Sequence, residues 1–198
     1  MSEVIEKHKY YELIGNWQWG SAYDIHTIHS EHYVDNSGQN RWNNTRSEMG
    51  ELVYQLKYKN DKLATKNIVS LLLKGYTGLE AVDIIIPVPP SKQRSFQPVY
   101  EICQELGASI NVPVLYDLLS KVTGTKELKG VESLDERYKL LQSSMSIQSR
   151  HNLKGKSVLL IDDLYRSGAT LRATTELLHS IEIRNVYVLT MTKTRSKR

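Results

Sequence analysis

The chain has little of what marks a secreted, disulfide-bonded or membrane protein. Its 198 residues include one cysteine and five prolines, and no run of about 18 apolar residues occurs. A single cysteine excludes a disulfide framework, and the missing apolar run excludes a membrane-spanning helix. Residues 1–11 are charged and lack the apolar core of a secretion signal. We therefore expect a cytoplasmic protein with no membrane contact.

The residues that are present fit a globular protein of ordinary size. Hydrophobic residues make up 40% of the chain, which is enough for a real core. The formal net charge is +4. This mild positive charge is compatible with phosphorylated ligands and with nucleic acid, and it does not decide between them.

The sequence pattern predicts an N-terminal region over residues 1–75 and a core over residues 76–198. Residues 17–27 alternate with the period of a strand, and a turn signal at 35–40 indicates a hairpin. Residues 46–75 show two apolar helical faces. We expect this region to form a small α+β unit beside the core.

Strand-like and helix-like segments alternate along the core. This alternation is typical of an α/β fold with a doubly wound parallel sheet. Strands are expected near residues 83–88, 112–116, 157–162 and 185–191. Helices are expected near residues 97–107, 134–141 and 170–181.

The most informative stretch spans residues 158–170. A continuous apolar run ends in Asp162 and Asp163, and a turn of small residues and a helix-like segment follow. Adjacent carboxylates at the end of a buried strand need cations, hydroxyls or backbone donors as partners. The turn of small residues and the helix start favour a phosphate, and the turn consists of Ser167, Gly168, Ala169 and Thr170. A solvated acidic turn before a capped helix is the simpler alternative.

A second apolar strand ends in a stiff, proline-rich loop. Pro98 suits the first turn of the helix that follows this loop. Such a loop presents backbone groups and cations to an anion. Its candidate residues are Pro89, Pro90, Ser91, Lys92 and Arg94.

The stretch at 158–170 resembles the motif with which type I phosphoribosyltransferases bind 5-phosphoribosyl 1-pyrophosphate (PRPP). The shared features are an apolar strand, two acids, four further residues, a glycine, any residue and a threonine. The resemblance implies that Asp162 and Asp163 bind the ribose hydroxyls. It also implies that residues 166–170 hold the 5′-phosphate and that the loop at 87–94 binds pyrophosphate. The fold implied is the type I phosphoribosyltransferase fold with a small N-terminal α+β hood.

The proline-rich loop resembles more narrowly the competence-associated, ComF-like branch of that family. The segments 46–58 and 189–195 are similar to this branch as well, so the resemblance covers most of residues 17–196. Many ComF-like proteins begin with a four-cysteine zinc ribbon. The single Cys103 cannot form one, and its helical spacing from apolar neighbours predicts a buried core thiol.

The segment 119–137 is long, polar and rich in cations. The resemblance implies the flexible catalytic loop that closes over PRPP, with Lys121 and Arg137 as candidates to reach the pyrophosphate. A solvated loop without a role is the alternative. His26, His29 and His32 lack a matching cluster of acids or cysteines, so we expect surface or hydrogen-bonded histidines and no metal site there. The alternative for His26 is a place in the lining of the active site.

The family resemblance implies transfer of the phosphoribosyl group to a nitrogenous acceptor, with Mg²⁺ held mostly by substrate oxygens. One departure is Arg166, which stands where purine-type members often carry an acid. The first alternative is therefore a protein that binds PRPP without turnover. The second is an accessory protein of DNA uptake that handles single-stranded DNA or binds competence proteins. A homodimer, common in the family, also stays open.

Overall fold

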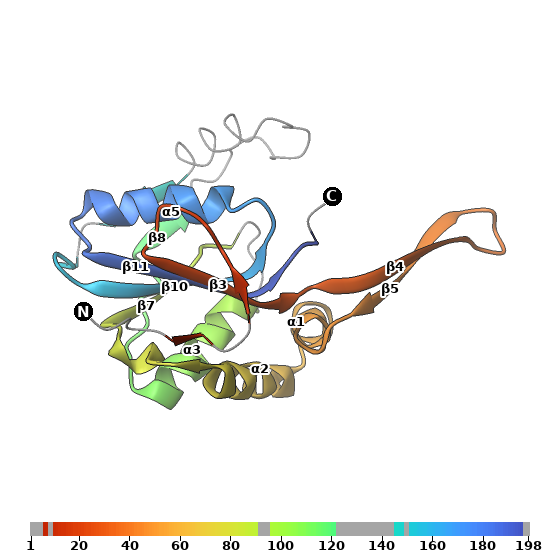
Figure 1. Cartoon of the computed structure of the whole chain (residues 1–198), viewed down its shortest axis with the longest axis horizontal. Helices are drawn as coiled ribbons and strands as arrows, with labels where there is room; N and C mark the ends of the chain where they lie inside the picture. The colour runs from red at the N-terminus through yellow and green to blue at the C-terminus, as the bar shows by residue number, and fades with distance from the viewer. Residues whose placement is uncertain (1–5, 8–9, 91–95, 122–144, 149–150, 196–198) are drawn as a thin grey trace.

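The computed structural model describes residues 6–7, 10–90, 96–121, 145–148 and 151–195 (Figure 1). Several predictions lie outside these ranges. They are the helix at 134–141 and the candidate residues Ser91, Lys92, Arg94 and Arg137. None of the helices in the described ranges combines the length and apolarity that crossing a bilayer requires.

The described residues form one central sheet of five strands. In spatial order these are β2 (Tyr11–Glu12), β3 (Trp19–Ile25), β11 (Asn185–Lys193), β10 (Ser157–Tyr165) and β7 (Ile84–Pro87). β3, β11, β10 and β7 run parallel, and β2 pairs antiparallel with β3 at the edge. At the centre, Leu160 pairs with Val188 of β11 on one side and with Ile86 of β7 on the other.

Helices cover both faces of this sheet (Figure 1). α5 (Ala169–Ser180) packs on one face, where it meets Val158 and Leu160 of β10. On the other face lie α1 (Glu48–Lys59), α2 (Lys62–Gly75) and α3 (Pro98–Ile110). Leu159 and Ile161 of β10 face that second layer. Alternate side chains of a strand point to opposite faces, so the apolar residues 158–161 of β10 are buried on both faces, and the predicted α/β class is confirmed.

β2 and β3 come from the predicted N-terminal region, yet they lie in the central sheet. The division of the chain at residue 75 therefore stays a prediction. Shorter elements complete the described fold. They are β1 (Glu6–Lys7), β6 (Tyr76–Thr77), the 3₁₀ turn η1 (Leu79–Ala81), and the antiparallel pair β8 (Leu119–Lys121) and β9 (Met145–Ile147).

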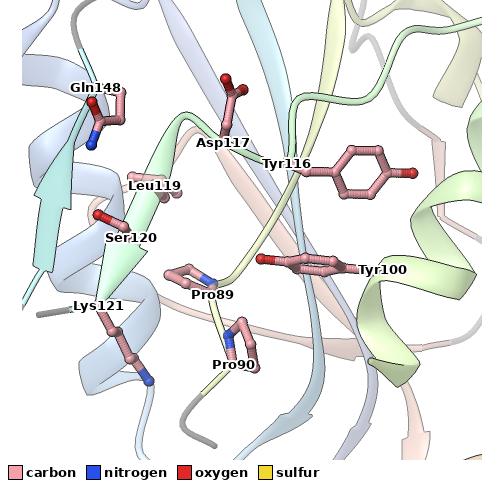
Figure 2. A pocket seen from close by; sticks show the side chains of 9 residues that line it. All are labelled: Pro89, Pro90, Tyr100, Tyr116, Asp117, Leu119, Ser120, Lys121 and Gln148. Atoms are coloured by element: carbon pink, nitrogen blue, oxygen red, sulfur yellow. The ribbon is translucent and has the colours of Figure 1, made fainter. Parts of the chain in front are cut away.

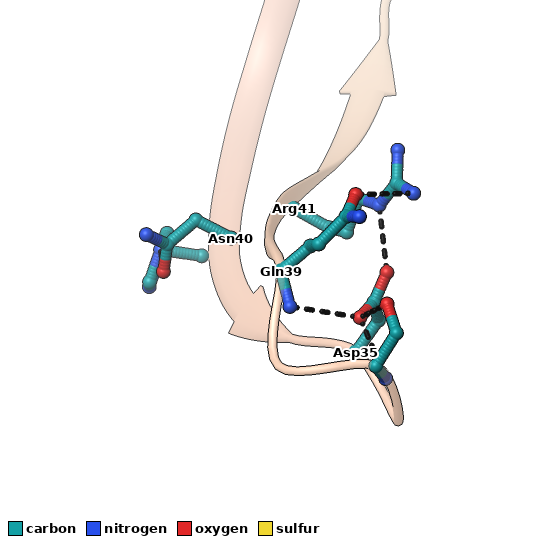
Figure 3. Close-up of polar contacts among 6 residues, drawn as sticks. Asp35, Gln39, Asn40 and Arg41 are labelled. Atoms are coloured by element: carbon teal, nitrogen blue, oxygen red, sulfur yellow. Dashed lines mark hydrogen bonds and ion pairs between the residues drawn. The ribbon is translucent and has the colours of Figure 1, made fainter.

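A two-stranded hairpin extends away from the body of the protein (Figure 1). It consists of β4 (Thr27–Val34) and β5 (Asn40–Arg46), and it confirms the predicted hairpin. Asp35 organises its turn (Figure 3): its carboxylate accepts hydrogen bonds from Ser37, from the Gln39 amide at 3.0 Å and from Arg41 Nε at 2.8 Å. These bonds, led by that from the Ser37 hydroxyl, hold the pKa of Asp35 well below its usual range.

Two predicted strands differ in extent from the observed ones. Residues 112–116 form no strand and make only one parallel bridge, from Val114 to Ile85. Pro113 has no N–H to donate and contributes only its carbonyl, which accepts from the Ile85 amide at 2.9 Å. β10, in contrast, continues past 162 to Tyr165, because β11 still pairs with it there.

Candidate active site

The two acids of the sequence motif lie inside β10, three and two residues before its end. Both side chains are half-buried. The Asp163 carboxylate forms an ion pair with Lys57 from α1, with Oδ2 and Nζ 2.6 Å apart. The exposed fractions are 22% for the Lys57 side chain and 18% for that of Asp163, so solvent screens the pair only weakly. The N-terminal helix layer thus supplies the cation that the adjacent acids need.

The Asp162 carboxyl has a different environment from that of Asp163. Its Oδ1 accepts a hydrogen bond from the Asp163 amide at 2.8 Å. Burial, and next the charge of Asp163, raises the pKa of Asp162 well above its usual range, although Lys57 and Lys121 oppose the shift. Asp163 therefore lies beside a cation, whereas Asp162 takes up a proton more readily than an ordinary aspartate.

We expect Asp162→Asn to stabilise the protein at pH 8 and to leave its stability nearly unchanged at pH 4. A raised pKa means that the folded chain binds more protons than the unfolded chain above about pH 4, so stability falls as pH rises through this range. Asparagine cannot ionise and removes this penalty, which is on the order of 4 kcal/mol at pH 8 for a pKa raised to about 7. Urea unfolding at the two pH values measures the effect. A variant less stable than the native chain at pH 8 would contradict the assignment.

The turn after β10 leads into the start of α5. Gly168 is the N-cap of α5 and has φ +74°, and within the described residues no side chain caps this helix start. The Tyr165 carbonyl accepts a hydrogen bond from the Thr194 amide at 2.9 Å, which fixes where the turn begins. Backbone N–H groups at the first turn of a helix favour a phosphate. The structure therefore brings residues 166–170 to the carboxyl end of β10, next to the acid pair, with Arg166 exposed.

Residues of β11 and of the N-terminal region also surround Asp163. The Thr192 hydroxyl donates to the Asp163 carbonyl at 3.1 Å. His26 Nδ1 lies 3.2 Å from the same hydroxyl, so it is the N–H donor to this oxygen. Burial, followed by Lys57 and Arg46, lowers the pKa of His26 and keeps it neutral near pH 7. His26 therefore lies beside the acid pair as an uncharged hydrogen-bond donor, and the described residues contain no group of His, Cys, Asp and Glu side chains arranged to hold a metal ion.

A pocket of about 390 Å³ lies beside the loop that follows β7 (Figure 2). Pro89 and Pro90 line it between Lys121 on one side and the rings of Tyr100 and Tyr116 on the other. The ring centroids of the two tyrosines are 5.2 Å apart. Burial lowers the pKa of Lys121, while the nearby Asp162 raises it. Lys121 therefore lies near both predicted parts of the site. It shares the pocket with Pro89 and Pro90 of the predicted pyrophosphate loop, and it is close enough to Asp162 of the acid pair for that charge to affect its pKa.

β8 and β9 pair directly before and after the segment 122–144. Lys121 pairs with Met145 and Ser120 with Ser146, so the residues that flank this segment lie side by side. The segment predicted to be the catalytic loop, 119–137, therefore begins with strand β8. Lys121 is the last residue of this strand.

Cys103 plays no part in this site as a nucleophile. Its side chain is fully buried in α3, and burial raises the pKa of its thiol well above the usual value. The prediction of a buried core thiol is confirmed. Lys57 and Thr192, in contrast, were missed. Lys57 belongs to a segment that carries the family resemblance, but nothing in the sequence assigns it a role.

Comparison with known protein families yields one model that matches most of the chain. The model of the phosphoribosyl transferase domain matches residues 73–198, which include β7, β10, β11 and α5. In sequence, the chain is 24% identical over 147 residues to competence protein F of Haemophilus influenzae. The match covers 69% of this chain and 64% of that protein, so the chain spans less than two thirds of this relative's length.

Two solved structures illustrate the similarity in fold. The glutamine PRPP amidotransferase of B. subtilis has a TM-score of 0.50 at 18% identity, over 80% of this chain and 35% of the other. The orotate phosphoribosyltransferase of Aeropyrum pernix has a TM-score of 0.45 at 17% identity, over 82% of this chain and 73% of the other.

Proposed function

The chain belongs to the family of phosphoribosyl transferase domains, and from this premise we propose that it binds PRPP with Mg²⁺ and transfers the 5-phosphoribosyl group to a nitrogenous acceptor, releasing pyrophosphate. The predicted relationship to the ComF-like branch is confirmed by the match to competence protein F. The observation that carries the proposal is the acid pair in β10, followed directly by the uncapped start of α5.

The acid pair and the helix start suit the two ends of a ribose 5-phosphate. Asp162 and Asp163 would accept hydrogen bonds from the vicinal ribose hydroxyls. The backbone N–H groups around Gly168 and the hydroxyls of Ser167 and Thr170 would bind the 5′-phosphate. This arrangement fixes the sugar at both ends, which lowers the entropic part of the barrier.

The leaving pyrophosphate needs positive charge near the anomeric carbon. Lys121, at the edge of the pocket beside Pro89 and Pro90, is the described cation on that side of the acid pair. Lys92, Arg94 and Arg137 join the proposal through the family resemblance alone. Mg²⁺ would neutralise charge on the pyrophosphate as it departs, and we propose that oxygens of PRPP supply most of its ligands, since the described side chains form no ready-made metal cluster.

Binding of PRPP without turnover is the second candidate function. Its support is Arg166, four residues after Asp162, at a position where many purine-type members carry an acid for the proton of the base. Its side chain is exposed and contributes a cation instead. An arginine there can pair with a phosphate but cannot serve as a general base.

A role in handling single-stranded DNA rests on the similarity to competence protein F and on the exposed hairpin. Trp42 is 62% exposed and Tyr33 is 48% exposed, so both rings can stack on bases. The hairpin arginines are engaged within the chain, Arg41 with Asp35 and Arg46 with Glu51. The charge pattern therefore supports this role less well than it supports PRPP binding.

Calorimetry and a pyrophosphate-release assay test the proposal together. We expect PRPP with Mg²⁺ to bind saturably and at least one nitrogenous base or amine in a panel to release pyrophosphate. Binding without release for any acceptor would favour the second candidate. No saturable binding of PRPP would exclude both.

A further inference from the structure

The ion pair between Lys57 and Asp163 joins the N-terminal helix layer to the acid pair. We propose that Lys57 is a positioning residue of the ribose site, which holds the Asp163 carboxylate in the orientation that accepts the ribose hydroxyls. This inference rests on the proposed function, because it assigns a role within the same PRPP site. Neither the family motif nor the sequence pattern gives Lys57 this role.

The geometry of α1 explains how Lys57 reaches β10. Ser47 caps the helix, and its hydroxyl accepts from the Gly50 amide at 3.0 Å. A Cβ at Gly50 would collide with the carbonyl oxygen of His26, so the close approach of α1 to the residue after β3 requires glycine at position 50. Lys57 follows Gly50 by seven residues, or about two helical turns, and lies on the same face. The contact at Gly50 therefore sets the position from which Lys57 extends to Asp163.

Asp163 is held at two points. Lys57 holds its carboxylate at 2.6 Å, and the Thr192 hydroxyl holds its carbonyl oxygen at 3.1 Å. One oxygen of the carboxylate, Oδ2, contacts the ammonium group. The orientation of the carboxylate is therefore fixed before any ligand binds, which reduces the cost of ordering it around a sugar.

The charged and titratable groups around the pair come from several elements. They are Lys57 of α1, His26 after β3, Lys121 of β8 and Cys103 of α3, with Arg46 of β5 near His26. Among these described groups, Lys57 forms the direct ion pair with Asp163. Without it, two adjacent carboxyls would share a half-buried site with less compensating positive charge, and protonation of one would become easier.

Lys57→Met tests the proposal, because methionine keeps an unbranched apolar stem and removes the charge. Lys57→Arg restores a cation, and Lys59→Met removes an exposed cation from the same helical turn as a matched control. Carboxyl carbon NMR of the ligand-free proteins follows the titration of Asp162 and Asp163. We expect Lys57→Met to move protonation of the pair to higher pH by about one unit. Lys57→Arg should largely reverse the shift, and Lys59→Met should leave it unchanged.

PRPP affinity measured by calorimetry from pH 6 to 9 gives the second readout. We expect Lys57→Met to weaken binding about tenfold at pH 7.5 and to move the loss of binding at low pH to higher pH. A loss of thermal stability alone, with a native titration and native PRPP affinity, would overturn the proposal. If the native chain does not bind PRPP, the proposed function fails, while the ligand-free titration still decides whether Lys57 acts on the acid pair.

Discussion

The double variant Asp162→Asn/Asp163→Asn is expected to bind PRPP about 1,000-fold more weakly than the native chain. Two carboxylates would accept hydrogen bonds from the ribose hydroxyls, and each charge-assisted bond contributes about 2 kcal/mol. Asparagine keeps the shape of each side chain but removes its charge. Isothermal calorimetry with PRPP and Mg²⁺ measures the loss, and release of pyrophosphate is expected to disappear with it.

Asp83→Asn is the matched control for the acid pair. Asp83 lies beside the other end of β10, where its carboxylate accepts from the Ser157 amide at 2.8 Å and pairs with Lys156 at 3.0 Å. Its substitution costs some stability and changes net charge in the same direction. It is expected to leave PRPP affinity unchanged, so equal losses in the two variants would show that the acid pair has no special part in binding.

Gly168→Ala is expected to weaken PRPP binding at least about tenfold and to destabilise the fold. Its φ of +74° is unfavourable for alanine by about 1 kcal/mol. A Cβ would also lie 2.8 Å from the Tyr165 ring. The Tyr165 ring or the turn must shift to relieve this contact. Together with the unfavourable φ, this is expected to move the N–H groups that would bind the 5′-phosphate. Calorimetry measures the affinity, and urea unfolding measures the stability.

Gly38→Ala separates the backbone strain from the effect on the site. Gly38 lies in the hairpin turn with a φ of +76°, and no atom is within 4 Å of the position a Cβ would take. Alanine there is expected to cost a similar 1 kcal/mol of backbone strain, by the same argument, and to leave PRPP affinity unchanged. Native PRPP affinity in Gly168→Ala would remove residues 166–170 from the proposed phosphate site.

The core of the fold could be predicted because its signals are local. The apolar runs of β7, β10 and β11 and the helical faces of α3 and α5 depend on neighbouring residues in the sequence. The end of β10 depends instead on its partner: β11 continues to Lys193, so β10 keeps its hydrogen bonds beyond Asp163 although its own sequence turns polar. The failed strand at 112–116 has a local cause instead, since Pro113 within the segment has no N–H to donate and limits pairing at the edge of the sheet.

The acid pair could be placed from the sequence, but its partners could not. Asp162 and Asp163 follow an apolar run whose position is evident. Lys57 reaches them only because α1 packs against the end of β3 at Gly50, and such a contact between distant segments leaves no periodic signal. The difference between the two acids is likewise a product of burial and charge in the folded chain.

The strand order has a consequence for how the chain is made. β11 lies between β3 and β10, yet it is synthesised after both. Until it emerges, β3 has no parallel neighbour, and β10 can pair only with β7. Such late, long-range pairing is slow, and nascent chains with unpaired strand edges are prone to associate with one another. Thr192, which donates to the Asp163 carbonyl, belongs to β11. The candidate site therefore cannot form before β11 pairs with β10.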